Sequence, residues 1–497
     1  MHFKPLIAAL ACATLAMPAF AQDKPQTAAE KGADDSNQFP PLPDDKSVDQ
    51  SVQIAGRTIR YKATVGTIPV RDDKGKEIGQ VVYTAYTVPG GGADRPVTFA
   101  FNGGPGASSV YLNMGAIGPK RVPFGDQGDS PSDAPVTTDN PNSWLDFTDL
   151  VFIDPIGTGF SRSLVDPDET KKHFYANDPD IEYLSKVVFD WLVKEERLRS
   201  PKYLVGESYG GYRVPRIAHE LQSQIGVGVN GMVLVSPYLD PASGAGSTAL
   251  SPLPWMVDLP SMAAAHLERE GRLTPEAMAQ VEAYTRGQFA TDLLQGRSDP
   301  AAVARLVDHV TELTGLDRNL VAKMGGRVDA GTYLREVHRA EGKIGSVYDS
   351  NVTGFDPFPW AAQQQSNDPL LETLIAPTTS AMVDFVTRVV GWKTTARYHA
   401  LSYAVNQAWD RGQPDDAPVQ DLRKAIANDP KMAVMIAHGW DDLSCPFFAS
   451  RLIVDQMPSF GMAQRVKLDV YPGGHMFYSR PDSGARFRAD AKALYGR

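Results

Sequence analysis

The chain has 497 residues and a formal net charge of −10 at pH 7. Its basic residues are scattered, so the sequence contains neither the basic stripe of a nucleic-acid-binding protein nor a basic amphipathic helix for a membrane surface. The length permits two or three domains, but a large α/β enzyme with an insertion fits it equally well.

The N-terminus has the pattern of a secretory signal peptide. Lys4 supplies the positive charge, residues 6–17 are apolar, and Ala19-Phe20-Ala21 forms a small-residue cleavage site. We therefore predict that residues 1–21 are a signal peptide and that the protein is exported, to the periplasm or beyond. The apolar run is too short to span a bilayer, and no later segment has the pattern of a transmembrane helix.

Residues 22–48 are rich in Asp, Ala, Pro, Ser and Lys and poor in apolar residues, so we predict a disordered leader there. Removal of the signal peptide leaves Cys445 as the one cysteine, and a single cysteine forms no internal disulfide. The residue type favours a small buried hydrophobic group over a reactive thiol.

The next part of the chain has two kinds of strand pattern. Residues 51–54, 58–65 and 81–88 are typical of antiparallel strands. Buried strands are predicted, each before a glycine- or proline-rich turn, at residues 97–101, 150–153, 203–205 and 232–235. Helical patterns at residues 184–198 and 214–224 lie between the later ones, which indicates a mostly parallel sheet covered by helices.

The pattern changes after Pro241. Helices are predicted near Leu267 and at residues 275–289, 300–314 and 377–390, with no strong strand runs between them. Strand patterns return at residues 432–437 and 466–470. The sequence therefore predicts an α/β core at residues 49–242 and 408–497, interrupted by a helical insertion at residues 243–407.

Gly206-Glu207-Ser208-Tyr209-Gly210 is the most informative motif, because a predicted strand precedes it and a predicted helix follows. This context is that of a nucleophile elbow, in which glycines relieve a tight turn that presents a serine hydroxyl. The alternative is a glycine-rich turn with a solvated serine.

A serine nucleophile needs a base and an orienting carboxylate, and on an α/β-hydrolase sheet these follow in the order Ser, Asp, His. His475 follows the last predicted strand, after two glycines. Asp441 and Asp442 follow the strand before it, and the residues alone do not separate them. His438 is the rival base, but it precedes both acids, which is the wrong order.

The Asn102–Ser109 segment, Asn-Gly-Gly-Pro-Gly-Ala-Ser-Ser, follows another predicted strand. Such a loop can supply one backbone N–H to an oxyanion, here that of Gly104, and the residue after the nucleophile, Tyr209, supplies the other. A phosphate-binding loop is disfavoured because no Gly-Lys-Ser/Thr sequence follows. We predict no cofactor, and no metal site, because the chain has no His-Glu-x-x-His motif and no cysteine cluster.

Four segments together resemble the serine carboxypeptidase family, a branch of the α/β-hydrolases. They are Asn102–Ser109, the stretch from Asn142-Ser-Trp144 to Asp154-Pro-Ile-Gly-Thr-Gly-Phe-Ser161, Gly206–Tyr212, and Gly474-His-Met476. The predicted insertion also falls where the family carries its lid.

The resemblance implies an α/β-hydrolase fold and an enzyme that removes residues from peptide C-termini. It implies a catalytic Ser208, His475 and Asp442, because Asp442 closes the family's Gly-x-x-Asp turn. It also implies oxyanion donors at Gly104 and Tyr209, carboxylate recognition by Asn102, Gly103 and Glu207, and contact of Met476 with the leaving residue.

One departure from the family pattern concerns a second glutamate, which in the family shares a proton with the glutamate before the serine. Counting without gaps from Asn102 places Ala116 at that position. The acid preference of carboxylate recognition is then expected to weaken or its mode to change. An esterase, amidase or acyltransferase on the same scaffold is the alternative, and a catalytically silent binding protein is a further one. The sequence indicates no oligomeric state.

Overall fold

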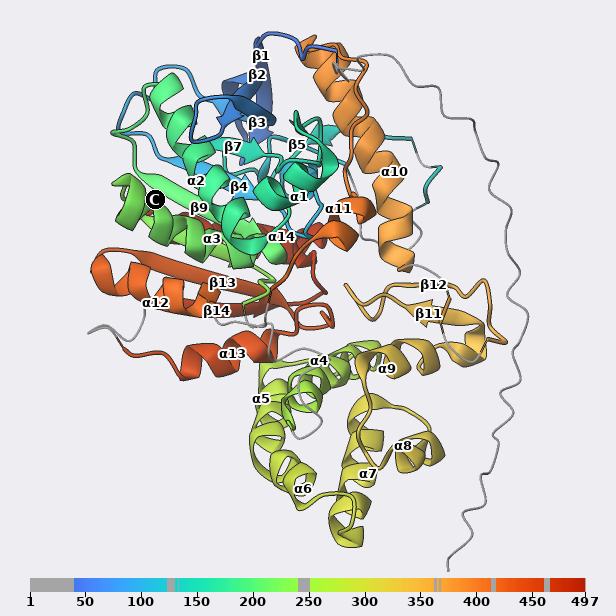
Figure 1. The fold of residues 1–497 in the computed structure, drawn as a ribbon. Coiled ribbons are helices and arrows are strands. Elements are labelled where there is room, and N and C mark those ends of the chain that lie inside the picture. Colours follow the sequence, from blue (N-terminus) through green and yellow to red (C-terminus); the bar gives the residue numbers. More distant parts are fainter. Residues whose placement is uncertain are drawn as a thin grey trace, which may run out of the picture. The chain divides into compact units, whose positions relative to one another are not determined.

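The computed structural model describes residues 40–122, 130–132, 134–239, 251–361, 364–365, 368–412, 417–459 and 465–496 (Figure 1). The predicted signal peptide and residues 22–39 of the predicted leader lie outside the described residues. Residues 42–497 group into one compact unit, which contains the sheets and helices.

A central sheet of ten strands runs through this unit in the order β1-β2-β3-β7-β4-β9-β10-β13-β14, with β8 paired to β3. The strands are β1 (Lys46–Ile54), β2 (Arg57–Arg71), β3 (Glu77–Thr87), β4 (Val97–Phe101), β7 (Asp149–Ile153), β8 (Arg162–Ser163), β9 (Lys202–Glu207), β10 (Gly231–Val235), β13 (Ala433–Gly439) and β14 (Val466–Tyr471). The neighbouring strands β7, β4, β9, β10, β13 and β14 pair in parallel, whereas β1, β2 and β3 pair antiparallel. The predicted mostly parallel sheet with an antiparallel edge is confirmed.

The predicted end of the leader is wrong, because β1 begins at Lys46. Asp45 already accepts hydrogen bonds from the backbone N–H of Thr67 (3.1 Å) and from Lys194 Nζ (2.5 Å). β1 is an edge strand, and exposed polar residues alternate along it with Val48, Val52 and Ile54. A strand with one solvated face has few apolar residues, which is why its first half resembles a polar leader.

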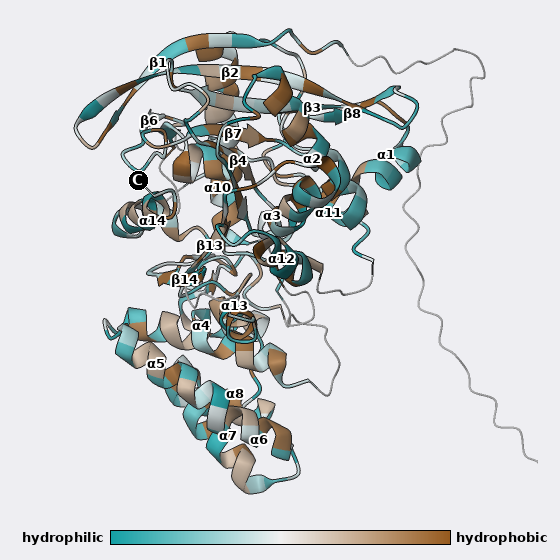
Figure 2. Ribbon diagram, turned by 90° about the vertical axis from the view of Figure 1, so that its left-hand side faces the viewer, coloured by the Kyte–Doolittle hydropathy of each residue, from teal (hydrophilic) through white to brown (hydrophobic). Residues whose placement is uncertain are grey.

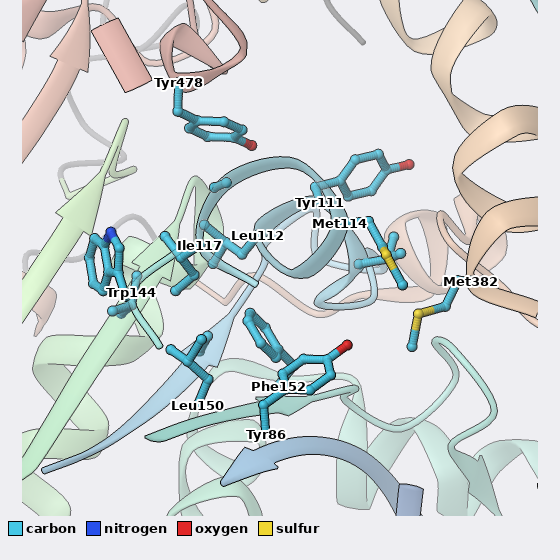
Figure 3. Packing of buried hydrophobic residues seen from close by; sticks show 14 of the residues in the cluster. Tyr86, Tyr111, Leu112, Met114, Ile117, Trp144, Leu150, Phe152, Met382 and Tyr478 are labelled. Atoms are coloured by element: carbon cyan, nitrogen blue, oxygen red, sulfur yellow. The ribbon is translucent and has the colours of Figure 1, made fainter. Parts of the chain in front are cut away.

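Two hydrophobic layers cover the two faces of the sheet. Alternate residues of each buried strand enter opposite layers, as Leu204 and Val205 do on β9, because successive side chains of a strand point to opposite faces. One layer is formed with α2 (Asn177–Lys194), α3 (Tyr209–Glu220) and α12 (Ala417–Asn428). The other is formed with the π-helical turns η1 (Leu112–Ile117), with α10 (Pro369–Asp384) and with α14 (Pro481–Leu494) (Figures 1 and 3).

Between β10 and α12 the described chain is mainly helical. The helices are α4 (Leu253–Arg269), α5 (Pro275–Tyr284), α6 (Ala290–Gln295), α7 (Pro300–Thr314), α8 (Arg318–Met324), α9 (Ala330–Glu336), α10 and α11 (Tyr403–Ala408). α7 has the bounds that the sequence predicts: Asp299 caps its first turn and Gly315, at φ 72°, ends it. The helix predicted to start at Pro377 instead begins at Pro369 and contains Pro377.

A short antiparallel hairpin, β11 (Lys343–Gly345) and β12 (Thr353–Phe355), also lies in this region, where the sequence predicts no strand. The helices α4 to α9 share a hydrophobic core of their own, which also includes Leu443, the neighbour of Asp442. Hydrophilic and hydrophobic residues alternate around α5 to α8, as expected for helices with one solvated face (Figure 2). Across the described ranges, every helix is too short or too polar to cross a membrane.

The remaining helices are α1 (Pro167–Phe174) and α13 (Phe447–Asp455), and a two-stranded sheet joins β5 (Lys120–Arg121) to β6 (Thr138–Asp139). α13 packs against α4, and Phe447 and Phe448 of α13 share a hydrophobic cluster with α4 and α5. The insertion therefore packs, through α4 and α5, against α13, the helix of the core that follows β13.

Candidate active site

Ser208 lies at a sharp turn between the end of β9 and the start of α3. Its φ of 61° and ψ of −123° are unusual for a residue with a side chain, and such strain is concentrated at functional sites. A Cβ on Gly206 would lie 2.0 Å from the carbonyl oxygen of Gly210, and one on Gly210 would lie 2.2 Å from that of Phe101. Both positions therefore require glycine for space, as predicted for a nucleophile elbow.

His475 and Asp442 meet at the carboxyl ends of β14 and β13. His475 Nδ1 lies 2.8 Å from Asp442 Oδ2, and both side chains are buried. Asp442 Oδ1 accepts the backbone N–H groups of Ser444 (2.8 Å) and Cys445 (3.0 Å), which fix its orientation. A carboxylate that accepts Nδ1–H leaves Nε2 of the neutral ring as a proton acceptor.

The charge of Asp442 sets the acid–base behaviour of His475. Burial opposes protonation of His475, but the Asp442 carboxylate, its hydrogen bond and the Glu207 carboxyl outweigh it, so the pKa of His475 is raised. His438, the rival base, lies within β13 and its Nε2 contacts Ser450 Oγ at 2.8 Å. Burial, together with the nearby His475, lowers the pKa of His438 to about 3, as suits a neutral core histidine.

Ser208 and His475 line one small cavity of ≈ 110 Å³. Its other lining residues come from the glycine-rich loop, the elbow, the insertion and the loops after β13 and β14: Asn102, Gly103, Gly104, Ala107, Tyr111, Glu207, Tyr348, Leu371, Leu401, Ser444 and Met476. Among the described residues no hydrogen bond joins the side chains of Ser208 and His475; catalytic contacts of this kind often tighten only when substrate binds. The cavity brings together seven of the nine predicted site residues. Of the other two, Asp442 contacts His475, and the backbone nitrogen of Tyr209 lies next to Gly103.

The glycine-rich loop lies against the elbow. A Cβ on Gly103 would be 2.4 Å from the backbone nitrogen of Tyr209, so only glycine allows this approach. Gly104, at φ 99°, adopts a backbone conformation that side chains disfavour. The fully buried Arg213 holds the loop in place. Its Nη1 donates to the carbonyl oxygen of Asn102 at 2.8 Å, and its Nε donates to Asp180.

Glu207 places a buried carboxyl in the cavity wall. Asn102 Nδ2 donates to its Oε2 at 2.9 Å, and the hydroxyl of Tyr478 lies 3.0 Å from Oε1 and 2.9 Å from Oε2. Burial is the largest influence and raises the pKa of Glu207 to about 7, against the opposing effects of His475 and of both hydrogen bonds. Glu207 is therefore readily protonated near neutral pH.

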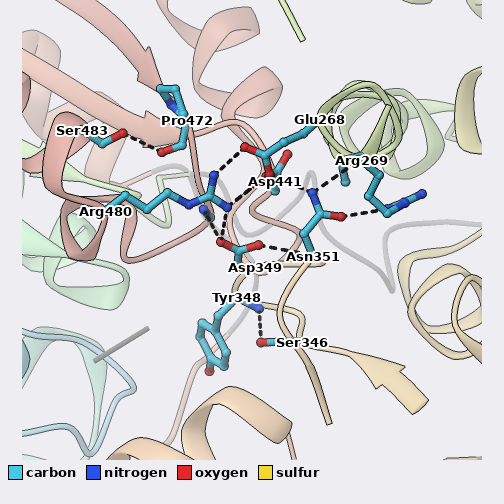
Figure 4. A network of polar contacts seen from close by, with 12 residues as sticks. Glu268, Arg269, Ser346, Tyr348, Asp349, Asn351, Asp441, Pro472, Arg480 and Ser483 are labelled. Atoms are coloured by element: carbon cyan, nitrogen blue, oxygen red, sulfur yellow. Dashed lines mark hydrogen bonds and ion pairs between the residues drawn. The ribbon is translucent and has the colours of Figure 1, made fainter. Parts of the chain in front are cut away.

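A cluster of charged residues lies beside the loops that carry Asp442 and His475 (Figure 4). Arg480 donates to Glu268 of α4 at 2.5 Å and to Asp349 at 3.1 Å, and lies 3.6 Å from Asp441. Asp349 also accepts the backbone N–H of Gly474 at 3.0 Å. The cluster thus ties the insertion to the residues next to Asp442 and His475, and Asp441 belongs to it and not to the contact with His475.

A family model described as serine carboxypeptidase matches residues 56–267, which include the glycine-rich loop and the elbow. Over these residues the chain is similar to the serine carboxypeptidases. It is 32% identical over 153 residues to the pheromone-processing carboxypeptidase KEX1 of Yarrowia lipolytica, and 31% identical over 165 residues to the probable serine carboxypeptidase CPVL of Homo sapiens. These alignments cover 30% and 31% of this chain, but only 23% and 32% of the relatives.

The serine carboxypeptidase-like 36 protein of Arabidopsis thaliana is 29% identical over 205 residues, 40% of this chain and 39% of that relative. The fold extends further than the sequence similarity. The crystal structure of the prohormone-processing carboxypeptidase KEX1(delta)p from Saccharomyces cerevisiae superimposes with a TM-score of 0.54 at 17% identity, covering 88% of this chain and 91% of that one. The predicted α/β-hydrolase fold, a mostly parallel sheet flanked by helices, is confirmed.

Three residues that the fold brings close to the site were not predicted from the sequence. Tyr478 and Arg480 follow His475 closely in sequence. Their closeness to a predicted catalytic residue is the one feature of the sequence that could have marked them as part of the site. Arg213 lies one turn beyond the elbow, on a helix whose buried face no motif marks.

Cys445 is expected to react slowly with iodoacetamide in the folded protein. Burial and then the Asp442 carboxylate raise the pKa of this thiol well above its usual value, and the thiolate is the reactive form. At pH 7.5 we expect alkylation at least about tenfold slower than in the denatured chain. Peptide mapping by mass spectrometry after timed quenching measures both rates; equal rates would show that the thiol is accessible.

Proposed function

We propose that the protein is an exported serine-type carboxypeptidase, which hydrolyses the C-terminal peptide bond of peptides or proteins. One observation carries the proposal: Ser208, His475 and the buried carboxyl of Glu207 line the same small cavity. A serine nucleophile beside a buried, protonatable carboxyl suits a peptide with a free C-terminal carboxylate, because the protonated carboxyl can donate to that carboxylate.

In the proposed mechanism, Ser208 Oγ attacks the carbonyl carbon of the scissile bond while His475 Nε2 takes its proton. Asp442 holds the imidazole in the tautomer that leaves Nε2 free and stabilises the imidazolium that forms. The backbone N–H groups of Gly104 and Tyr209 stabilise the oxyanion. His475 then gives the proton to the leaving amine, and the acyl-enzyme on Ser208 is hydrolysed by a water that His475 activates in turn.

The substrate carboxylate is proposed to bind at Asn102, the backbone of Gly103 and Glu207. Two carboxylates repel each other in a buried site, so Glu207 must be protonated to donate to the substrate. Met476 lies in the cavity wall, where the side chain of the leaving residue would contact it. Tyr348, Leu371 and Leu401 reach the same cavity from the insertion, so we propose that they contribute to side-chain preference.

The test is hydrolysis of an N-blocked dipeptide and of its C-terminally amidated twin between acid and mildly alkaline pH. We expect the free acid to be cleaved at least about tenfold faster, because an amide leaves the buried Glu207 and Asn102 without their partner. Equal cleavage of both substrates would replace the proposal by a broad amidase or esterase. Loss of all turnover, including that of a simple ester, would favour a silent binding protein.

Export is the second part of the proposal, and it rests on the N-terminal sequence pattern. Expression of the full chain in a Gram-negative host is expected to yield a processed protein outside the cytoplasm that begins at Gln22. N-terminal sequencing of fractionated cells measures this. An unprocessed cytoplasmic product would contradict it.

A further inference from the structure

Tyr478 occupies the position from which a side chain can control the carboxyl of Glu207. Its hydroxyl lies within 3.0 Å of both carboxyl oxygens, and both residues are buried. The tyrosine belongs to the turn η7 (Phe477–Ser479), which follows His475 and packs against η1. Figure 3 shows its ring beside the coil of η1, near Leu112.

The contacts of Glu207 assign different tasks to its two oxygens. Oε2 accepts from Asn102, whose own Oδ1 accepts the backbone N–H of Leu112 at 2.9 Å, so this amide is fixed. A proton on the carboxyl is therefore directed to Oε1. The Tyr478 hydroxyl lies near both oxygens and thereby restricts rotation of the carboxyl.

We propose that Tyr478 is a positioning residue for substrate specificity: it orients the Glu207 carboxyl toward the C-terminal carboxylate of the peptide. The inference rests on the proposed carboxypeptidase function. Ala116 stands where the family has its second glutamate. It lies on η1, the element against which η7, with Tyr478, packs. In this chain the partner of Glu207 is a neutral phenol and not a second carboxyl.

A neutral partner changes how recognition depends on pH. Burial raises the pKa of the Tyr478 phenol well above its usual value, so only Glu207 of this pair titrates below pH 10. The other titratable groups that act on Glu207 or feel its charge are His475 and Asp442 on the catalytic loops, Cys445 after them, and Tyr111 before η1. The phenol and thiol pKa values are raised, so Tyr111 and Cys445 stay neutral across the working range.

The predicted pH profile for a free-acid peptide has two limbs. Activity rises with pH as His475 loses its proton and falls as Glu207 loses its own, because an ionised Glu207 repels the substrate carboxylate. An N-blocked amino-acid ester has no carboxylate, so its profile has the rising limb only. The falling limb thus reports on Glu207 and on what Tyr478 does to it.

The decisive variant is Tyr478→Phe, assayed for kcat/KM with both substrates. The hydroxyl donates to the charged form of Glu207 and lowers its pKa, so its loss raises that pKa. We expect the falling limb to move up by about one pH unit, with the ester profile unchanged. Tyr86→Phe is the matched control, because Tyr86 is also fully buried but donates to the amide of Asn113 at 2.9 Å; its limb should not move.

Glu207→Gln supplies an independent arm. A glutamine remains a neutral donor, so the falling limb should disappear while the preference for the free acid persists at pH 9. A uniform loss of activity in Tyr478→Phe with the limb unmoved would overturn the inference and leave the tyrosine a packing residue.

If Tyr478→Phe does not fold, the pH profile of the wild-type enzyme with the free-acid peptide tests whether the partner of Glu207 is neutral. A falling limb with a slope of one proton supports a lone carboxyl with a neutral partner, and a slope approaching two protons contradicts it. Absence of any preference for the free acid in the wild type would instead refute the proposed function itself.

Discussion

Replacement of Ser208 by alanine is expected to lower kcat on the free-acid peptide by a factor on the order of 10⁶. In the proposed mechanism the acyl part of the substrate is transferred to this hydroxyl, and alanine at the strained turn offers no nucleophile in its place. The proposed oxyanion donors and the proposed carboxylate site remain in the variant, so KM should change little and a small activity above the uncatalysed rate should persist.

Steady-state kinetics with purified Ser208→Ala and wild-type enzyme measure this loss. Ser444→Ala is the matched control: Ser444 lines the same cavity, but its contact with Asp442 is made by the backbone N–H, which alanine retains. We expect a change within about tenfold for it. Labelling by a phosphonate ester should place one adduct on Ser208; an undiminished kcat in Ser208→Ala would exclude the acyl-enzyme mechanism.

Replacement of Arg480 by methionine is expected to lower the free energy of unfolding by about 3–5 kcal/mol. The variant keeps Glu268, Asp349 and Asp441, three largely buried acids, and removes the cation between them. Because the cluster joins α4 to the loops of Asp442 and His475, kcat should fall as well. Arg480→Lys keeps a charge but not the two-armed geometry, and it should lie between methionine and the wild type.

The cost of removing Arg480 should depend on pH. Burial acts to raise the pKa of Glu268, but hydrogen bonds and the charge of Arg480 outweigh it and lower that pKa to about 2. The stability this provides is present above the usual carboxyl pKa and is lost as the pH falls toward 2. Destabilisation in Arg480→Met should therefore be larger at pH 7 than at pH 4, where the acids of the variant take up protons.

Chemical denaturation of both proteins at the two pH values measures the difference. The control is Arg388→Met, because Arg388 and its partner Asp384 are 70% and 43% exposed and water screens such a pair, so its loss should change the stability little. If Arg480→Met were as stable as Arg388→Met at pH 7, the cluster would not hold the insertion to the core.

The features that the sequence predicted well depend on neighbours along the chain. The buried strands, the helix at Pro300–Thr314 and the elbow at Ser208 each follow from hydrophobic periodicity, a cap or a glycine within a few residues. Because the carboxyl ends of parallel strands meet at one edge of a sheet, the strand order also predicts that the motifs after β4, β9, β13 and β14 share one site.

The tertiary structure decided which side chains face one another. Asp441 and Asp442 are adjacent in sequence, yet one lies beside Arg480 and the other beside His475, because the turn after β13 points successive side chains in different directions. Tyr478 meets Glu207 across 271 residues, and no local pattern announces such a contact. The sequence alone thus determined the class of chemistry, through residue types and strand order, whereas long-range packing determined the partner of each charge.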